Sequence, residues 1–481
     1  MIFIDLFYAM RDQYTDRTCD SDKNRIMKSV RIGAGAGYAG DRIEPAVDLI
    51  RKGELDYVVF ECLAERTISI AQQDKMRDAS GGHDGLLLHR MSRVLTPLRE
   101  HGVRMVSNMG AANPLGAAQK IFDLARSCGL QKLRIAAITG DDVSDRIGQF
   151  LDLETFETHA PLRSLGDSII SANAYTGARK ITEALADGAD IVITGRTADP
   201  ALTVGPLMHE FGRAYDDYEF LGKATVAGHL LECGSQVMGG YFADPGYKDV
   251  DELWNIGFPF ADFDSDGLVT IGKLPDSAGQ VSNATVKEQL LYEIHDPASY
   301  LTPDVIADFS GVTVSDNGND SVTVAGATGR EKTGQLKVSV GYLDGYIGEG
   351  EISYGGPGAL ARARLAAEVI RRRFKLIGLN LNDARFDFIG VNSLFGNAGP
   401  ARGRTGAIEA QSQDVRLRVA GRTRTEEEAR LIGREVEALY TNGPAGGGGA
   451  RGNVRQTVSI ASILIPESEV DEKITYLDLN E

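Results

Sequence analysis

Cysteine and positive charge are scarce in this chain of 481 residues. Its four cysteines are scattered and form no Cys-x-x-Cys pair, which argues against a disulfide framework and against a thiolate zinc site. Lys and Arg number 51 against 68 Asp and Glu, so the formal net charge is −17 and a nucleic-acid backbone or an anionic membrane would be repelled on average. We therefore expect neither nucleic acid nor a membrane as a partner.

A basic leader is missing as well. The opening "MIFIDLFYAM" is apolar but soon meets charged residues, so we expect neither a signal peptide nor a membrane span. Together with the scattered cysteines, this favours a cytoplasmic location.

The composition that remains, 42% hydrophobic and 25% charged, is typical of a globular protein with real cores. From residue 30 to about 210, apolar segments alternate with stretches long enough for a helix. This alternation predicts an α/β fold: an N-terminal open, mostly parallel sheet with crossover helices. β-branched runs and helical patterns after residue 300 predict a smaller C-terminal α/β (α+β) domain.

The expected boundaries follow from these patterns. Residues 1–28 are interpreted as an extension, because "MKSVRIGAGAG" from Met27 reads as a domain start. Residues 29–300 are expected to form the parallel domain with a helical insertion, residues 301–470 the second domain, and residues 471–481 a tail.

A Gly-x-Gly-x-x-Gly pattern at Gly35, Gly37 and Gly40 follows the first predicted strand. In dinucleotide-binding folds such glycines let the backbone approach a pyrophosphate, and an acid such as Glu61 follows roughly 20 residues later. The pattern alone is weakly specific, and Gly33 adds a glycine that it does not require. We expect this loop to face the site and to hold a carboxylate, a phosphate or part of coenzyme A; NAD-dependent oxidoreduction is kept as an alternative.

Five predicted strands are each followed by a loop that carries glycine, amide or charge. In an open parallel sheet such loops gather at one edge, where ligands bind. Glu61 ends the strand "DYVVFE", where apolar surroundings would raise its pKa and suit it to acid–base catalysis. The structural alternative is a helix cap or an ion pair with Arg66.

The segment "GHLLECGSQVMGG" predicts a helix with His229, Glu232 and Gln236 on one polar strip. A histidine and a carboxylate three residues apart can share a metal or form an acid–base pair. We favour the acid–base pair, because further metal ligands are not evident and the sequence names no cofactor. An ordinary amphipathic helix is the structural alternative.

Two further loops offer binding groups. In "TGRTADPAL", Arg196 could hold a carboxylate or phosphate and Asp199 could exchange a proton, or the two could form a structural ion pair. In "NMGAANP", Asn108 and Asn113 could donate to a carbonyl or could serve as turn residues.

A glycine run at 446–449, followed by Arg451, could nest an anion. Ordering so many glycines costs conformational entropy, so a partner surface would have to hold them. We therefore expect this loop to lie against the N-terminal site or against another subunit, and the protein to be a homo-oligomer.

Several segments in this order resemble the acyclic terpene utilisation family, AtuA: "GAGAGYAGDR", "ECLAERT", "NMGAANP", "TGRTADPAL", "GHLLECGSQVMGG", "VSNATVKEQLLYEIHDPASYLTPDV" and "GPAGGGGARGNVRQ". The resemblance runs from about residue 29 to 465. It implies a cytoplasmic catabolic protein that acts on branched or terpenoid-derived carboxylic acids, often as coenzyme A thioesters. The resemblance also implies a ferredoxin-fold AtuA-like domain, which many relatives carry either fused or as a separate small protein. We expect this sequence to end before such a domain and therefore expect a small partner protein.

The resemblance and the residues together predict an enzyme of the lyase or hydratase type. The second hypothesis is a non-catalytic subunit that binds an acyl group or an acyl-CoA and works with a small partner.

Overall fold

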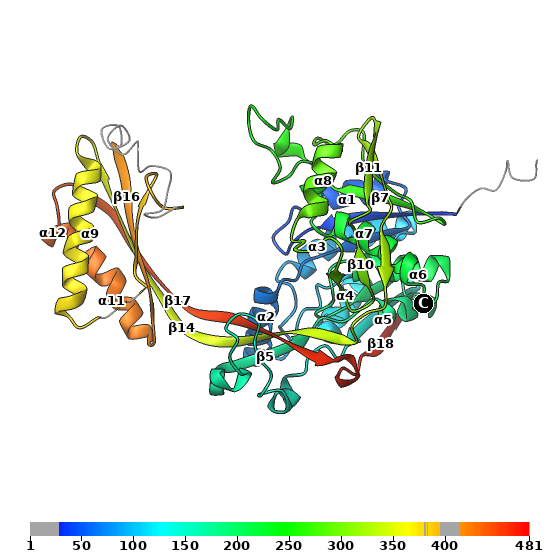
Figure 1. The fold of residues 1–481 in the computed structure, drawn as a ribbon, viewed down its shortest axis with the longest axis horizontal. Helices are drawn as coiled ribbons and strands as arrows, with labels where there is room; N and C mark the ends of the chain where they lie inside the picture. The colour runs from blue at the N-terminus through cyan, green and yellow to red at the C-terminus, as the bar shows by residue number, and fades with distance from the viewer. Residues whose placement is uncertain (1–27, 380, 382, 395–412, 481) are drawn as a thin grey trace, which may run out of the picture.

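The computed structural model describes residues 28–379, 381, 383–394 and 413–480. It shows a large main body and a smaller distal lobe, joined by a ribbon of two long strands, β14 (Gln335–Gly355) and β17 (Gly447–Pro466) (Figure 1). We use "distal lobe" for the described residues between 344 and 456 and "main body" for the rest. The expected extension, residues 1–28, lies outside the described residues except for Lys28.

The main body is built on a ten-stranded sheet in the order β11-β12-β8-β7-β1-β2-β3-β6-β4-β18. Its middle strands run parallel. They are β1 (Ser29–Ala36), β2 (Tyr57–Phe60), β3 (Arg104–Ser107), β6 (Ile191–Ile193) and β4 (Leu133–Thr139). Runs such as "YVVF" are apolar throughout because these strands are buried on both faces. The predicted α/β class is thus confirmed.

Helices cover both faces of this sheet and form two separate cores. One face packs against α1 (Glu44–Lys52), α3 (Leu87–His101) and α4 (Pro114–Ser127). The other packs against α5 (Arg179–Ala186), α6 (Ala201–Phe211) and α7 (Tyr218–Glu232). Helix α7 is apolar nearly all round, as its burial on every side requires.

Antiparallel strands extend the sheet on both sides. They are β7 (Pro259–Asp264), β8 (Val269–Lys273), β12 (Ser321–Ala325) and β11 (Thr313–Gly318) beside β1, and β18 (Lys473–Leu479) beside β4. Strands on both sides of the expected boundary at residue 300 therefore share one sheet, and the segment expected to be a tail contains β18.

Smaller elements complete the main body. Helix α8 (Asn283–Leu291) and a three-stranded sheet pack against α7. The strands of that sheet are β9 (Tyr300–Leu301), β10 (Ile306–Asp308) and β13 (Thr328–Arg330).

The ribbon begins on the main body. There β14 pairs with β5 (Ile169–Ala174) on one side and with β17 on the other. Helix α2 (Glu65–Arg77) packs against this three-stranded part. The ribbon therefore leaves the main body directly beside the loop that follows β2.

The distal lobe contains α9 (Ala359–Leu376), β15 (Arg385–Ile389), β16 (Asp414–Thr423), α11 (Glu426–Glu437) and α12 (Leu439–Asn442) between the ends of β14 and β17. Its antiparallel strand order, β15-β16-β14-β17, with α9 and α11 on one face, is the split βαβ arrangement of ferredoxin-like domains (Figure 1). This lobe lies within the stretch 301–470 that was expected to form the second domain, and it spans a shorter part of the chain.

Glycine lets the lobe's helix approach its sheet closely. A side chain at Gly348 on β14 would collide with the carbonyl oxygen of Ala429 on α11, and Gly452 on β17 lies against Gly433 on the same helix. Gly447, Gly448 and Gly449, expected to be a loop, form the start of strand β17.

Candidate functional site

A cavity of about 500 Å³ opens in the main body at the carboxyl ends of β1 and β2. Its walls come from the loop after β1, the start of α2, the turn after β6 and the segment that follows α7. This is the edge at which ligands bind in open parallel sheets. Of the residues predicted from sequence, five line it: Gly37, Glu61, Asp199, Glu232 and Gln236.

Glu61 follows β2 and is held by two hydrogen bonds. The side chain of Asn108 and the backbone N–H of Leu63 both donate to its Oε1, each at 2.9 Å. Burial and the nearby Asp199 carboxylate raise the pKa of Glu61 well above its ordinary value. Its contacts are therefore not those of the ion pair with Arg66 that was the structural alternative.

Asn108 is a positioning residue in this geometry. It is fully buried, and its Oδ1 accepts a hydrogen bond of 2.7 Å from the backbone N–H of Cys62. With its amide oxygen fixed in this way, the amide nitrogen is aimed at Glu61.

Arg196 is fully buried below the cavity. Its guanidinium donates to the carbonyl oxygens of Leu63 and Thr197 and to the carboxylate of Asp199, and it lies 4.3 Å from the ring centroid of Tyr175. The guanidinium is thus bonded to other groups of the protein. Arg196 therefore supports the cavity wall and does not line the cavity.

Asp199 keeps one side open to the cavity, with 37% of its side chain exposed. Burial raises its pKa, although the attached Arg196 opposes this. Asp199 and Glu61 are thus two carboxyl groups in one cavity, and each makes ionisation of the other less favourable.

His229 and Glu232 form a buried pair, in which His229 Nδ1 lies 2.8 Å from Glu232 Oε1. Burial raises the pKa of Glu232 to about 7. Burial alone would lower the pKa of His229, but the Glu232 carboxylate raises it overall. Only Glu232 reaches the cavity, because His229 packs against Tyr300 and Phe309.

Sequence reasoning missed Glu65 and Tyr175, which line the cavity beside the base of the ribbon. Hydrogen bonds from Tyr175 and Lys337 outweigh burial and lower the pKa of Glu65 to about 2. Glu65 stands in the segment "ECLAERT", so that motif held a second acid. Tyr175 follows β5, a strand that pairs with β14 and lies outside the large sheet.

Two cysteines line the cavity, Cys62 and Cys233. Burial raises the pKa of both thiols. They therefore stay protonated near neutral pH, which argues against a thiolate nucleophile.

The cavity is strongly acidic. Carboxyl groups from six residues line it, namely Asp41, Glu61, Glu65, Asp199, Glu232 and Glu293, and none of its described lining residues is Lys or Arg. No group of three or more His, Cys, Asp or Glu side chains among the described residues is arranged to hold a metal ion. An anion would meet repulsion here, whereas an uncharged group could accept hydrogen bonds from protonated carboxyls.

Aromatic rings stand at the opening. Tyr38 and Tyr241 are 62% and 88% exposed and line the cavity together with Tyr292. Rings at the entrance of a polar cavity provide apolar surface for the hydrocarbon part of a ligand.

The glycine fingerprint is explained by packing within the chain. A side chain at Gly35 would strike the ring of Phe60, and one at Gly37 would strike the backbone of Cys233. The N–H of Gly37 donates to Asp41 at 2.9 Å. Gly35 therefore does not line the cavity, and Gly37 lines it with its N–H already bonded.

Two other predicted residues lie away from the cavity. Asn113 caps α4, with its oxygen accepting from Gly116 N–H and its nitrogen donating to Ala79 and Gly81. Arg451 is on β17 in the distal lobe, where its Nε lies 3.7 Å from Glu351. The glycine run and Arg451 thus do not reach the N-terminal site of their own chain.

In a comparison with protein families, the model for "Acyclic terpene utilisation family protein AtuA" matches residues 30–476. The chain belongs to the AtuA family. It is thereby linked to catabolism of acyclic terpenes. A comparison with curated protein sequences gives no match for the chain. None of the helices in the described part of the chain combines the length and apolar character that crossing a membrane requires.

Proposed function

We propose that this protein is an enzyme of the lyase or hydratase type, which acts by acid–base chemistry on a branched or terpenoid-derived acyl compound. The observation that carries the proposal is the pair of carboxyl groups, Glu61 and Asp199, which share one cavity and have raised pKa values. Pairs of titratable groups whose surroundings separate their protonation states commonly divide the roles of acid and base.

The contacts of the two carboxyl groups suggest which role each takes. Asp199 is attached to the permanently charged Arg196, which favours its ionised form. Burial and the nearby Asp199 charge favour the protonated form of Glu61, and they outweigh the hydrogen bonds from Asn108 and the backbone N–H of Leu63, which favour the ionised form. Asp199 is therefore the general base, and Glu61 is the general acid.

In the hydratase direction, Asp199 takes a proton from water while the water oxygen bonds to the β-carbon of an α,β-unsaturated acyl group. The electron pair of the double bond moves toward the carbonyl, and Glu61 supplies a proton to the α-carbon. The second proton of the water stays on the new hydroxyl group, so the elements of water are added and no redox partner is needed. The lyase direction is the reverse.

The charge of the cavity favours one of the two substrate forms considered. A free carboxylate would enter a site lined by acids, whereas a thioester presents an uncharged carbonyl. We therefore favour the coenzyme A thioester, with its branched hydrocarbon chain against Tyr38, Tyr241 and Tyr292 at the opening. Its phosphates would remain outside the cavity.

The test uses branched, α,β-unsaturated acyl-CoA thioesters and the matching free acids, with loss of the enoyl-thioester absorbance as the readout. Glu61→Gln and Asp199→Asn should each lower kcat by at least about 100-fold, as expected for a general acid or base. His229→Ala should lower kcat less, because His229 acts through Glu232. The control is Glu100→Gln, at an exposed acid near the end of α3. Its kcat should stay within about threefold of the wild-type value.

Other outcomes favour the alternatives. Tight thioester binding with no turnover, and no effect of Glu61→Gln on that binding, would indicate a non-catalytic acyl-CoA subunit that needs a partner, such as a small ferredoxin-fold AtuA-like protein. Micromolar binding of NAD(H), NADP(H) or FAD by calorimetry would instead support the oxidoreductase hypothesis. If both carboxyl variants turn over the active substrate within about threefold of wild type, the acid–base assignment fails.

A further inference from the structure

Charge is divided unequally between the two parts of the molecule. The sequence from 344 to 456 holds 17 Lys and Arg against 13 Asp and Glu, and 16 of those 17 are arginine. The rest of the chain holds 34 Lys and Arg against 55 Asp and Glu. The lobe is therefore net positive. The rest of the chain has a net negative charge that is larger than the net charge of the whole protein.

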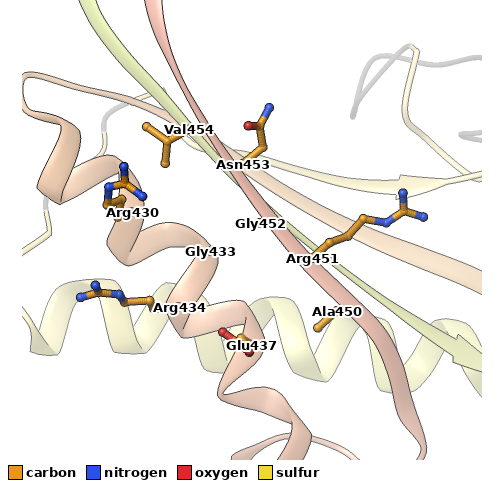
Figure 2. A pocket seen from close by; sticks show the side chains of 9 residues that line it. All are labelled: Arg430, Gly433, Arg434, Glu437, Ala450, Arg451, Gly452, Asn453 and Val454. Carbon is orange, nitrogen blue, oxygen red and sulfur yellow. The ribbon is translucent and has the colours of Figure 1, made fainter.

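Three exposed arginines of the lobe do not all point in the same direction (Figure 2). A groove of about 270 Å³ lies between α11 and β17 (Figure 2). Arg430 and Arg434 extend from α11 on one side of it, whereas Arg451 extends from β17 away from them (Figure 2). Diverging guanidinium groups do not enclose one small anion, but they suit a broad acidic surface.

The ribbon holds the lobe away from its own main body (Figure 1). Its base lies beside the cavity, as the contacts of Lys337 show. On β14, Lys337 lies 3.1 Å from a carboxylate oxygen of Glu65 and 5.1 Å from the ring centroid of Tyr175, two residues that line the cavity. Helices α9 and α11 pack mainly on the lobe's own sheet. The basic surface is thus presented on an arm that starts at the acidic cavity.

We propose that the arginine-rich distal lobe of one copy docks on the acidic, cavity-bearing side of a second copy of this chain. Complementary charge selects this occupant, because the chain outside the lobe holds 55 Asp and Glu against 34 Lys and Arg, and six of those acids line the cavity. A nucleic acid would instead meet a protein of net charge −17, which opposes its approach. Assembly of this kind does not depend on the reaction proposed above, and it is measured without substrate.

Sedimentation and light scattering of the full-length protein test this association. At about 50 mM salt the wild type should have at least twice the chain mass of 51.7 kDa, and the assembly should weaken at 500 mM salt because charge attraction is screened. The triple variant Arg434→Glu, Arg451→Glu, Arg455→Glu should fall to the mass of one chain. All three side chains are exposed, so the variant should keep the wild-type circular dichroism spectrum.

The matched control carries the same change of charge on the main body: Arg51→Glu, Arg93→Glu, Arg99→Glu, all at exposed positions. It should remain assembled. Hydrogen exchange should then be slower in residues 290–296, at the cavity rim, in the assembled wild type than in the lobe variant. A monomeric wild type, a lobe variant that assembles as well as the control, or unchanged exchange at the rim would each overturn the proposal.

Discussion

The acids of the main body and the arginines of the distal lobe have opposite kinds of surroundings. Glu61 and Asp199 share one cavity, where burial raises their pKa values. Arg416 and Arg418 lie on the open face of the lobe's sheet and are paired across strands with Glu351 and Glu349, each at 2.6 Å. The cavity holds crowded carboxyl groups of like charge, whereas Arg416 and Arg418 on the open face of the lobe's sheet are each paired with an acid.

This difference indicates where function lies. Crowding carboxyl groups in a cavity disfavours their charged forms and weakens the folded state, so such a group needs a reason other than stability. Partly exposed ion pairs on a sheet surface cost little and keep the surface polar. This contrast supports the acid–base role proposed for the cavity, whereas the ion pairs of the lobe's sheet require no such role.

The largest expected effect separates the two regions physically. In Gly348→Ala the new methyl group meets the carbonyl oxygen of Ala429, so α11 must move away from the sheet. Overpacking of this kind typically costs about 1–3 kcal/mol. Chemical denaturation should show the loss in the lobe's transition, and limited proteolysis should cut the lobe faster while the main body stays resistant.

Gly355→Ala is the matched control on the same strand. Its nearest neighbour, the carbonyl oxygen of Gln413, is 4.0 Å from the position of the new methyl group, so stability should stay near wild type. Equal destabilisation by both substitutions, or simultaneous loss of both regions, would show that the lobe and the main body do not unfold separately.

Strand ends were the informative part of the sequence. The apolar run "YVVF" predicted a buried parallel strand and so placed Glu61 at the ligand-binding edge, and "DIVITGRT" did the same for the Arg196–Asp199 turn. Which member of that turn would face the ligand was not predictable, because it depends on Leu63 and Thr197 accepting from the guanidinium.

Pairing between distant segments could not be predicted. The ribbon forms because β14 meets β17 more than 100 residues later, and no local pattern specifies that partner. The glycine run illustrates the same limit: flexible in isolation, Gly447 and Gly448 are ordered by pairing with Tyr354 and Ser353. The fingerprint glycines also matched a ligand motif, although Gly35 serves contact with Phe60.

A second, smaller effect should appear when pH changes. Burial raises the pKa of Asp304 to about 6, from an ordinary value near 3.8. Because the folded pKa exceeds the unfolded one, the contribution of Asp304 to stability is full below about pH 4 and is lost as pH rises through 6. Asp304→Asn should therefore gain stability relative to wild type between pH 5 and pH 8, by about 2 kcal/mol.

Asp414→Asn, at an exposed position in the lobe, is the control and should follow the wild type at every pH. Thermal unfolding at pH 5, 6, 7 and 8 supplies the measurement. A constant difference between Asp304→Asn and wild type across this range would mean that Asp304 does not change its protonation on unfolding.

The smallest effect is expected where the lobe's charges are removed in pairs. Arg416 and Glu351 are 23% and 18% exposed, and Arg451 lies 3.7 Å from the same carboxylate, so it can replace part of the lost contact. A double-mutant cycle of Arg416→Gln and Glu351→Gln should give a coupling free energy below about 1 kcal/mol, as is usual for pairs in contact with water. The single variants should unfold within a few degrees of wild type. A coupling free energy above about 2 kcal/mol would show that this pair behaves as a buried ion pair. The lobe's sheet surface would then no longer differ from the cavity in the way described above.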